Sequence, residues 1–454
     1  MTIGPLSSTL FGDMFGTAAM HAVVGEAAFL ARCAEVEAAL ARAQARLGIV
    51  PAAAAEVISA AAAAVAADPQ SLDLDRLKRE TANVGYPILP LVRQLAERAG
   101  EAGRWLHWGA TTQDIMDTAV VLQIRDGLAL VDHDLAAVRG HLAALARRWR
   151  GAPIAGRTHL QHALPITFGF KAAVWLSAFD RHARRLDELR PRVLVAQFGG
   201  AAGTLASLGE GDAALGSRRE LARELGLGEP AITWHVARDA IVETVQFLAL
   251  LGGSLAKVAF DVMLMSATEF GEAAEPFVAG RGSSSTMPQK RNPISCELIL
   301  AAAKALRQHA GLMLDALVSD FERATGPWHV EWIAVPESFG YAAGALHQAE
   351  FMLGGLIVDP ARMAKNLSMT HGLIVAEAVM MGLAPHTGRN EAHDFVYDAC
   401  RKAIDEDRPL YDVLLEIPEV AKPLGAEKLR ALTDPANYLG AAQAMVDRVL
   451  ANHR

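Results

Sequence analysis

Residues 280–293 read Gly-Arg-Gly-Ser-Ser-Ser-Thr-Met-Pro-Gln-Lys-Arg-Asn-Pro. A flexible linker would share the glycines and serines, but linkers rarely end in a lysine and an asparagine just before a proline. We expect Pro293 to open a helix, because a missing backbone N–H costs least at that position. The first turn of a helix carries partial positive charge and free N–H groups. Lys290, Asn292 and this helix start together predict a binding site for a carboxylate.

The chain on both sides of this segment is predicted to be helical, because apolar residues recur at helical spacing over long stretches. Prolines begin three of the expected helices, where they are well tolerated. The helices are much longer than the average of about 11–12 residues. Such lengths suit a bundle whose apolar faces are covered by one another and by neighbouring subunits. We therefore predict an all-α fold, with long helices at residues 113–149, 165–189, 233–270, 293–317 and 336–357.

Three helical domains are expected along the chain. Residues 1–105 hold shorter, alanine-rich helices, residues 106–357 hold the long helices, and residues 358–454 turn polar again and are punctuated by prolines. A chain of 454 residues is too long for one small core, which favours this division. Alternating runs of β-branched residues are almost absent, so few strands are expected.

Composition favours a cytoplasmic protein. Hydrophobic residues make up 52% of the chain, but many are alanine, and no segment reaches the roughly 20 strongly apolar residues that a membrane span needs. The first residues lack the basic start and apolar run of a secretion signal. Cys33, Cys296 and Cys400 lie far apart without CxxC spacing, which indicates a reducing compartment.

Charge and motif content argue against several kinds of partner. The net charge of −8 and the lack of a basic run with interleaved aromatics speak against nucleic acid. The sequence holds no metal-spaced ligand set, phosphate-cradling glycine loop or dinucleotide fingerprint, so we expect no metal and no cofactor. A local cluster of cations can still bind a small anionic substrate.

A second polar segment, Gly-Arg-Thr-His-Leu-Gln-His-Ala-Leu-Pro at residues 156–165, contains two histidines. His159 and His162 are three residues apart and could share a helix face, but no third metal ligand is suggested nearby. Thr158 and His159 could instead cap the following helix. An unperturbed histidine titrates near neutrality, which suits proton donation to a leaving group.

A third polar segment, residues 107–117, precedes the first long helix. Thr111 or Thr112 can cap that helix, and both, with Gln113, can donate hydrogen bonds to a carboxylate. Arg238 and Arg323 are further candidate anion binders, although either could form a surface ion pair worth little.

Residues 280–293 resemble the signature of the fumarase/aspartase superfamily, Gly-Ser-Ser-x-x-Met-Pro-x-Lys-x-Asn-Pro. The resemblance implies a homotetramer with a twenty-helix core, in which each active site is built from segments of three subunits. It makes Ser284 the general base, and Lys290 and Asn292 the ligands of the substrate carboxylate. A serine alkoxide can persist only if backbone N–H groups and a nearby cation stabilise it and water is excluded.

The other polar segments resemble the same superfamily. Residues 158–163 resemble its Thr-x-x-x-His-Ala stretch, which makes His162 the general acid or proton relay and His159 a substrate contact. Residues 111–113 resemble its substrate-binding Thr-Ser segment, with Thr112 where serine is usual. His107 matches a histidine of adenylosuccinate lyases and carboxymuconate cycloisomerases. Residues 197–204 resemble a turn that packs near the site.

Within the superfamily the chain most resembles the bacterial 3-carboxy-cis,cis-muconate cycloisomerases, lactonising enzymes of aromatic catabolism. Trp332 stands where adenylosuccinate lyases place an arginine, and Ala82-Asn83-Val84 follows Glu-Thr where they carry Arg-His-Asp. Groups suited to a nucleotide are therefore missing. Gln289 and Ala237 depart from the cycloisomerase pattern. A lyase that releases fumarate from a substituted succinate therefore stays open, as does, in another class, an inactive helical scaffold.

Overall fold

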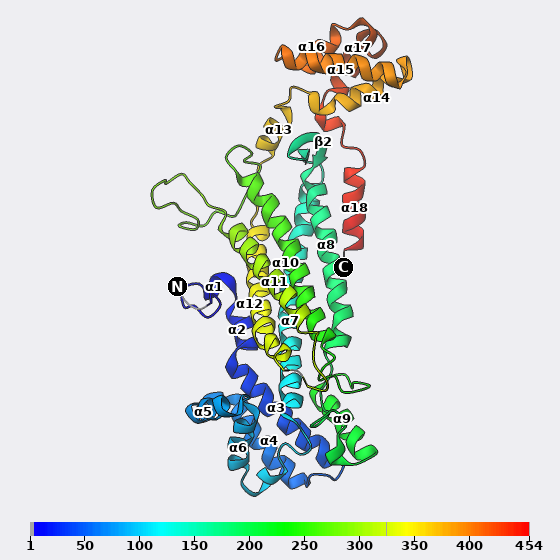
Figure 1. Ribbon diagram of the computed structural model, residues 1–454. Coiled ribbons are helices and arrows are strands. Elements are labelled where there is room, and N and C mark those ends of the chain that lie inside the picture. Colours follow the sequence, from blue (N-terminus) through cyan, green and yellow to red (C-terminus); the bar gives the residue numbers. More distant parts are fainter. Residues whose placement is uncertain (1–3, 324, 454) are drawn as a thin grey trace. The chain divides into compact units, whose positions relative to one another are not determined.

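Helices make up nearly all the secondary structure of the computed structural model, which describes residues 4–323 and 325–453 (Figure 1). Eighteen α-helices and two small antiparallel sheets, each of two strands, occur in this part of the chain. Short 3₁₀ turns lie at Pro69–Ser71, Gly100–Trp105, Ala206–Leu208, Leu373–Val375 and Pro435–Asn437. The predicted all-α class is confirmed.

The described residues divide into two compact units. The first comprises the residues up to Ala136, His182–Ala256 and Leu298–Gln348. The second comprises Ala137–Arg181, Lys257–Glu297 and the residues from Ala349 onward. The three domains expected from composition stay a prediction.

Within the described residues, the first unit contains seven shorter helices. They are α1 (Gly12–Phe15), α2 (Ala18–Val24), α3 (Glu26–Arg46), α4 (Ala52–Ala67), α5 (Leu74–Val84), α6 (Ile88–Ala99) and α9 (Asp212–Leu225). Helices α3 and α4 pack closely because both faces carry alanine, including Ala39 and Ala55. Buried Leu40, Ile58 and Leu91 fill the core between α3, α4 and α6. Alanine-rich sequence thus serves close helix packing.

Five long helices each contribute residues to both units. They are α7 (Thr112–Arg148), α8 (Phe168–Val193), α10 (Asp239–Ser266), α11 (Ile294–Asp315) and α12 (Pro327–Gly354). The predicted bounds of α7 and α11 are correct to within two residues. Three predicted starts are wrong: the helix predicted from residue 233 begins at Asp239, and the other two concern prolines. Pro165 lies in a strand, and Pro336 lies inside α12, where it removes one backbone hydrogen bond but does not end a helix held by buried Trp328 and Phe339.

Helix α10 corrects an expectation from the sequence. By length and composition it could cross a membrane, and it is the one single helix in the described part of the chain that meets this test. The bent pair Pro360–Ser368 and Leu373–Thr387 meets it together. The expectation that no segment is apolar enough is therefore wrong. An apolar helix can also serve a protein core, and Leu248, Leu251 and Leu255 of α10 are fully buried in the first unit.

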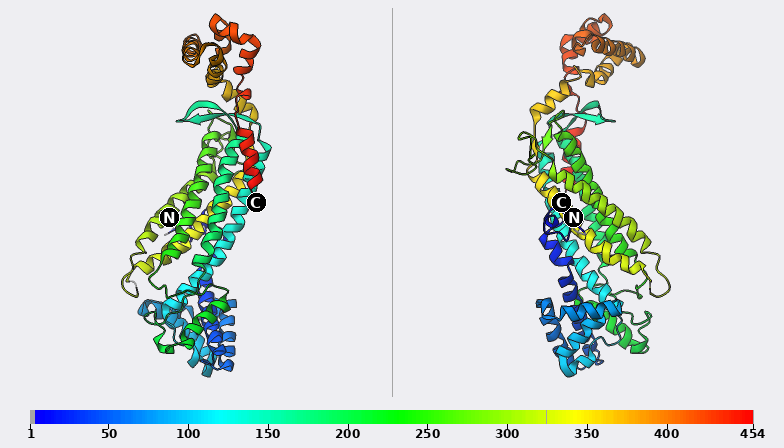
Figure 2. Two further views of the ribbon diagram at one scale, coloured as in Figure 1. Left: turned by 90° about the vertical axis from the view of Figure 1, so that its right-hand side faces the viewer. Right: turned by 60° about the vertical axis from the view of Figure 1, so that its left-hand side comes forward.

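The second unit contains a β-hairpin that the sequence analysis did not predict. Strands β1 (Pro153–Thr158) and β2 (Gln161–Thr167) pair antiparallel with a bulge between Ala155 and Arg157. The hairpin lies beside α13 (Pro360–Ser368), as Figure 2 shows. The two-stranded sheet β3 (Ala273–Ala274) and β4 (Ile357–Val358) lies in the same unit. Its remaining helices are α14 (Ala376–Thr387), α15 (Arg389–Asp405), α16 (Leu410–Leu415), α17 (Pro418–Leu432) and α18 (Ala442–Asn452).

Candidate active site

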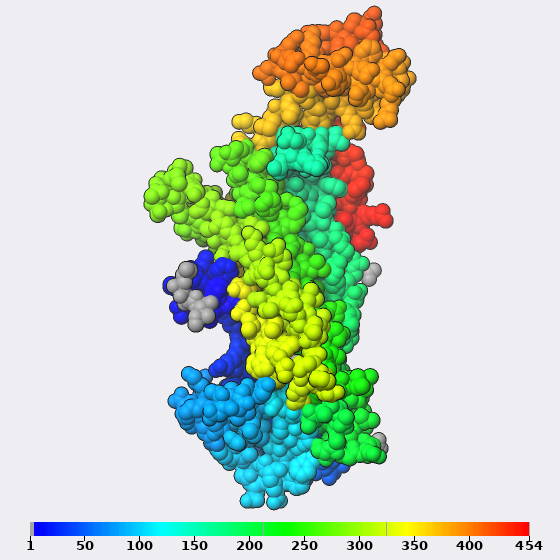
Figure 3. All heavy atoms as spheres, viewed as in Figure 1, coloured from blue at the N-terminus to red at the C-terminus, as the bar shows by residue number. Residues whose placement is uncertain are grey.

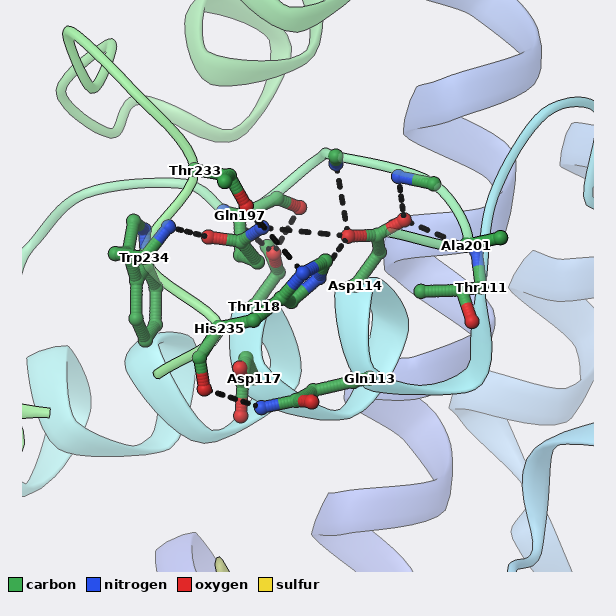
Figure 4. A network of polar contacts seen from close by, with 12 residues as sticks. Thr111, Gln113, Asp114, Asp117, Thr118, Gln197, Ala201, Thr233, Trp234 and His235 are labelled. Carbon is green, nitrogen blue, oxygen red and sulfur yellow. Dashed lines mark hydrogen bonds and ion pairs between the residues drawn. The ribbon is translucent and has the colours of Figure 1, made fainter. Parts of the chain in front are cut away.

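The carboxylate of Asp114, in the first turn of α7, organises the polar segment that precedes this helix (Figure 4). Its Oδ1 accepts hydrogen bonds from Gly199 N at 2.9 Å and His235 Nε2 at 2.7 Å. Its Oδ2 accepts from Gly200 N at 2.9 Å and Thr111 N at 3.0 Å. Gln197 Nε2 also donates to Oδ1, at 3.4 Å, so this buried carboxylate has five donors and is well satisfied. Asp114 therefore holds the turn at residues 197–204 against Thr111.

Gln113 takes part in the same network from the buried side of α7. Its Nε2 donates to the carbonyl of His235 at 2.9 Å, and its Oε1 is buried without a hydrogen-bond partner. Gln197 donates to Thr233 Oγ1 at 2.8 Å and accepts from Trp234 N at 2.9 Å. Gln113 thus lies inside the protein, and its amide is used to hold the His235 segment.

Arg323 carries a positive charge that no carboxylate in the described part of the chain neutralises through an ion pair. Its Nη1 donates to Thr111 Oγ1 at 2.8 Å and its Nη2 donates to the carbonyl of Ala201 at 2.9 Å. Its Nε is buried without a hydrogen-bond partner. Thr112, half-buried, is the first residue of α7. A guanidinium with only neutral acceptors, next to a helix N-terminus, is suited to an anion.

Arg238 lies in the interior, away from the surface position that sequence allowed. It is 2% exposed, and its three nitrogens donate to the carboxylates of Asp117 at 2.7 and 3.0 Å and of Glu331 at 2.8 and 2.5 Å. Burial opposes its charge, but the two carboxylates outweigh burial and raise the pKa of Arg238. Burial in turn raises the pKa of Glu331. Four of its five N–H donors are used by these two carboxylates, so Arg238 is committed to the interior ion pairs and its predicted role as a substrate ligand is not supported.

A cavity of about 820 Å³ opens beside this buried cluster in the first unit. Figure 3 shows the hollow between the dark blue N-terminal helices, the light blue α5 and the yellow α12. Trp328, Trp332 and Phe339 of α12 form one wall, and Thr81 and Ala82 of α5 another. The ring of Tyr86 stacks on Trp328, with centroids 5.7 Å apart. The cavity is therefore largely apolar and aromatic.

His159 forms the tip of the β1–β2 hairpin in the second unit. His159 and Leu160 have φ values of 51° and 64°, and both are exposed between the paired residues Thr158 and Gln161. Two consecutive residues with positive φ make the tight turn that suits the twist of a hairpin. His159 and His162 therefore do not share a helix face, because the chain forms strands here. Among the described residues no group of three or more His, Cys, Asp or Glu could hold a metal ion.

His162 lies on β2 opposite Arg157 and is half-buried. Arg157 forms a two-pronged ion pair with Glu272 at 2.8 and 2.7 Å. Burial and the charge of Arg157 lower the pKa of His162, while Glu272 opposes them. Its Nδ1 is buried without a hydrogen-bond partner. Burial and Arg157 therefore favour the neutral imidazole.

The loop at residues 280–293 holds Ser284 in a turn. Ser284 Oγ accepts hydrogen bonds from Met287 N at 3.0 Å and Thr286 N at 3.3 Å. The base of the loop is closed by the bond from Asn292 N to Gly282 O at 3.0 Å. Gly282 has a φ of 69°, and a Cβ there would lie 2.5 Å from Asn292 O. Lys290 is exposed and Asn292 is half-buried, so both can meet a ligand.

The sequence analysis predicted that the N-terminus of α11 is free to bind a substrate carboxylate, but this position is occupied. Glu275, which is 8% exposed, accepts hydrogen bonds from Cys296 N at 2.8 Å and Ser295 N at 3.2 Å. The carboxylate at this helix start therefore comes from the chain itself. That expectation is wrong, because Glu275 fills the position.

Comparison with known proteins decides the family. A family model described as Lyase matches residues 17–307, more than half of the chain. A second model, described as Adenylosuccinate lyase C-terminus, matches residues 372–449. The chain belongs to the fumarase/aspartase superfamily. It is an enzyme of this superfamily, which sets the scaffold alternative aside.

Relatives that match nearly the whole chain are named for different reactions. Trans-aconitate decarboxylase 1 of Mycosarcoma maydis is 48% identical over 445 residues, which cover 98% of this chain and 89% of the relative. The 3-carboxy-cis,cis-muconate cycloisomerase of Pseudomonas aeruginosa is 47% identical over 451 residues, covering 98% and 97%. The crystal structure of fumarate lyase from Mesorhizobium sp. BNC1 has a TM-score of 0.90 at 62% identity, covering 96% of this chain and 98% of that one. These proteins share the fold and the family of this chain, but their names refer to different reactions.

Several residues that organise this superfamily site were missed by sequence reasoning. Asp114 was quoted only as part of a segment, while Glu37, which binds His107 Nδ1 at 2.6 Å, and Glu275 were not considered. Each is an acidic residue on or near a helix, and such residues usually face solvent. Their partners lie 70, 85 and 21 residues away in sequence. No local pattern could have found them.

Proposed function

We propose that this enzyme removes or adds a proton on a carbon next to a carboxylate, with Ser284 as the general base. The observation that carries the proposal is the pair of backbone N–H groups, from Thr286 and Met287, that donate to Ser284 Oγ. These donors meet the first requirement of a serine alkoxide. A hydrogen bond to a charged group stabilises it by about 1.5–3 kcal/mol. Two such bonds do not suffice alone, so a cation and exclusion of water are also needed.

Lys290 and His162 supply the remaining roles in the proposal. Lys290 provides the cation, and with Asn292 binds the carboxylate whose charge grows as the proton leaves. His162 transfers the second proton, as general acid or relay, and its lowered pKa makes the imidazolium form a stronger proton donor. His159, at the exposed hairpin tip, contacts the substrate. Thr111, Thr112 and Arg323, with Gln113 holding their segment, bind a further carboxylate.

The substrate class is proposed to be an unsaturated tricarboxylate. Two relatives are named for such compounds, trans-aconitate and 3-carboxy-cis,cis-muconate. Trp332 and Ala82 line the cavity of the first unit, and neither side chain supplies a charge for a nucleotide phosphate. By contrast, Arg323 and Lys290 are cations that form no ion pair with a carboxylate among the described residues. This arrangement favours several carboxylates over one phosphate.

The reaction we propose first is the lactonising cycloisomerisation of 3-carboxy-cis,cis-muconate, a step of aromatic catabolism. A carboxylate oxygen of the substrate bonds to one alkene carbon, and the enzyme delivers a proton to the neighbouring carbon, which lies next to another carboxylate. The substrate anion takes up this one proton and loses the charge of the carboxylate that forms the lactone, so the acid forms of substrate and product are isomers. In reverse, Ser284 removes that proton. The resemblance of residues 160–171 and 327–332 to cycloisomerases and the relative from Pseudomonas aeruginosa support this choice.

Decarboxylation of trans-aconitate is a second candidate, because the relative with that name is 48% identical. β-Elimination from a substituted succinate with release of fumarate is a third, since it uses the same proton removal. All three need an acid and a base next to bound carboxylates. They differ in the bond that breaks or forms, so product identity separates them.

The assembly is proposed to be a cytoplasmic homotetramer with active sites shared between subunits. Apolar residues that are exposed on the long helices support an interface with other subunits. They are Val174, Leu250, Phe260, Leu314 and Ile333, each about half exposed. Such residues on long helices are suited to pack against neighbouring subunits.

A substrate panel tests the function. Purified enzyme is offered 3-carboxy-cis,cis-muconate, trans-aconitate, nitrosuccinate, aspartate, argininosuccinate and adenylosuccinate, and products are identified by mass, with Ser284→Ala as control. We expect lactone from 3-carboxymuconate with wild-type protein only, both before and after EDTA treatment. Turnover of adenylosuccinate instead, or a loss with EDTA that a divalent ion restores, would overturn the proposal.

A further inference from the structure

Helix α3 holds the His107–Trp108 segment through two buried polar side chains. Glu37 and Gln44 are seven residues apart, which places them on one face of the helix, and they are 1% and 0% exposed. Glu37 Oε1 lies 2.6 Å from His107 Nδ1, and Gln44 Nε2 donates to the carbonyl of Trp108 at 2.8 Å. Two adjacent residues of the segment are thus fixed from a single helix.

The carboxylate of Glu37 is an expensive group to bury. Its second oxygen, Oε2, has no hydrogen-bond partner, and the His107 ring is its one ion-pair partner among the described residues. A buried carboxylate needs a compensating positive charge. His107 itself has a φ of 59°, a conformation that non-glycine residues keep only where their surroundings hold them. A role for the imidazole explains why both costs are tolerated.

The orientation of His107 leaves one ring nitrogen available. Since Nδ1 faces Glu37, Nε2 points to the opposite side of the ring, where it has no protein hydrogen-bond partner among the described residues. The side chain is 24% exposed, while that of Glu37 is fully buried. Thr111, which accepts a hydrogen bond from Arg323, follows His107 by four residues in the same segment. The free nitrogen thus belongs to the segment that is proposed to bind a substrate carboxylate.

We propose that Glu37 is a positioning residue, which keeps His107 as an imidazolium whose Nε2–H donates to a carboxylate of the substrate. The inference rests on the proposed function and extends it, because it adds His107 to Arg323 as a second cation beside the Thr111 segment. An imidazolium–carboxylate hydrogen bond is stronger than one between neutral groups.

The charges around His107 agree with this protonation state. Burial lowers the pKa of His107, but the carboxylate of Glu37 on α3, helped by Asp114 on α7, outweighs burial and raises it above its ordinary value. Asp114 itself also binds His235. The ring therefore keeps its positive charge to a higher pH than an ordinary histidine does.

Glu37→Gln tests the proposal, because glutamine has nearly the same shape and its oxygen can still accept from Nδ1. With trans-aconitate as the probe, calorimetry across pH 6–9 should show affinity at pH 7.5 reduced by about ten- to a hundredfold, the loss expected for one charged hydrogen bond. At pH 6 the loss should be smaller, because His107 of the variant becomes protonated there. Glu37→Asp, which keeps the charge, should restore part of the affinity. Glu56→Gln, which removes an exposed carboxylate on α4, is the matched control and should bind like wild type.

A double-mutant cycle separates this role from a structural one. In a His107→Gln background, Glu37→Gln should cause no further loss of affinity, since the two residues act as one pair. An additive loss, or a loss in Glu37→Gln that is equal at pH 6 and pH 7.5, would overturn the proposal. If Ser284→Ala keeps full activity while this pH-dependent loss is observed, the proposed base is wrong and the role of Glu37 stands.

Discussion

The side-chain oxygen of Ser284 accepts a hydrogen bond from the backbone N–H of Met287 at 3.0 Å, three residues further along the same loop. The loop thus carries part of the stabilisation that a serine base needs. Backbone donors cost no reorganisation when charge develops, provided the loop keeps its shape.

Replacing Ser284 by alanine should abolish proton transfer and leave the fold intact. We expect kcat to fall by at least about 10²-fold, the lower end for a positioned base, while the stability changes by less than about 0.5 kcal/mol because the residue lies in a surface loop. Solvent-deuterium exchange into the substrate measures the step. Ser285→Ala, at the exposed neighbouring position, is the control and should exchange normally. Persistent exchange in Ser284→Ala would identify another base.

Gly282 and Gly280 allow the shape of the loop to be tested. Both have positive φ, 69° and 82°, so alanine strains either position equally. A Cβ at residue 282 would also meet Asn292 O at 2.5 Å, whereas at residue 280 it would meet nothing within 4 Å. Gly282→Ala should therefore lower kcat well below that of Gly280→Ala, with little change in melting temperature for either. Equal activity of the two variants would contradict a role for this closure.

Arg323→Gln should weaken substrate binding, because it removes the charge that no ion pair neutralises. We expect KM to rise by about ten- to a hundredfold, the effect of one charged hydrogen bond, and kcat to change less. Arg93→Gln, at an exposed ion pair with Glu80, should leave KM unchanged. Steady-state kinetics at two salt concentrations make the comparison. An unchanged KM in Arg323→Gln would remove this residue from the binding site.

Arg238→Met should destabilise the protein, since Asp117 and Glu331 would keep their charges in the interior without a partner. Breaking a buried ion pair from one side costs about 3–5 kcal/mol, compared with at most about 1 kcal/mol for the exposed pair of Arg192 and Glu243. Thermal unfolding of Arg238→Met and Arg192→Met compares the two. The loss should shrink as pH falls, because Glu331, whose pKa is raised, is then protonated. A loss that grows in acid would contradict the assignment.

Mixing two inactive variants should restore activity if the sites are shared between subunits. Ser284→Ala and His162→Ala are each expected to be inactive, but a mixed tetramer contains some sites with both native residues. Co-refolded mixtures should recover a fraction of the wild-type rate, and mixtures of either variant with itself provide the baseline. Mixtures that exchange subunits and remain inactive would show that each site uses Ser284 and His162 of one chain.

The helical spacing of apolar residues and the motif in the loop at residues 280–293 explain why the helical class and the family could be predicted. Helical spacing of apolar residues is repeated over many turns, so the core of α7 at residues 113–148 was predicted almost to its ends. The β1–β2 hairpin was not predicted, because its strands are six and seven residues long and carry little alternation. Pro336 was taken for a helix start, although buried neighbours on α12 hold the helix through it.

The sequence by itself determined the helical class, the family and the loop that carries Ser284, because these depend on residues close together in the chain. Only the tertiary structure decided which charges are available to a ligand. Arg238 and Arg323 look alike in sequence, yet Asp117 and Glu331 neutralise the first, and the second has neutral acceptors alone. In the same way Glu275 fills one helix start, and Glu37 reaches His107 from 70 residues away. Whether a charge is free depends on burial and on partners brought together by folding, and neither can be seen in a local pattern.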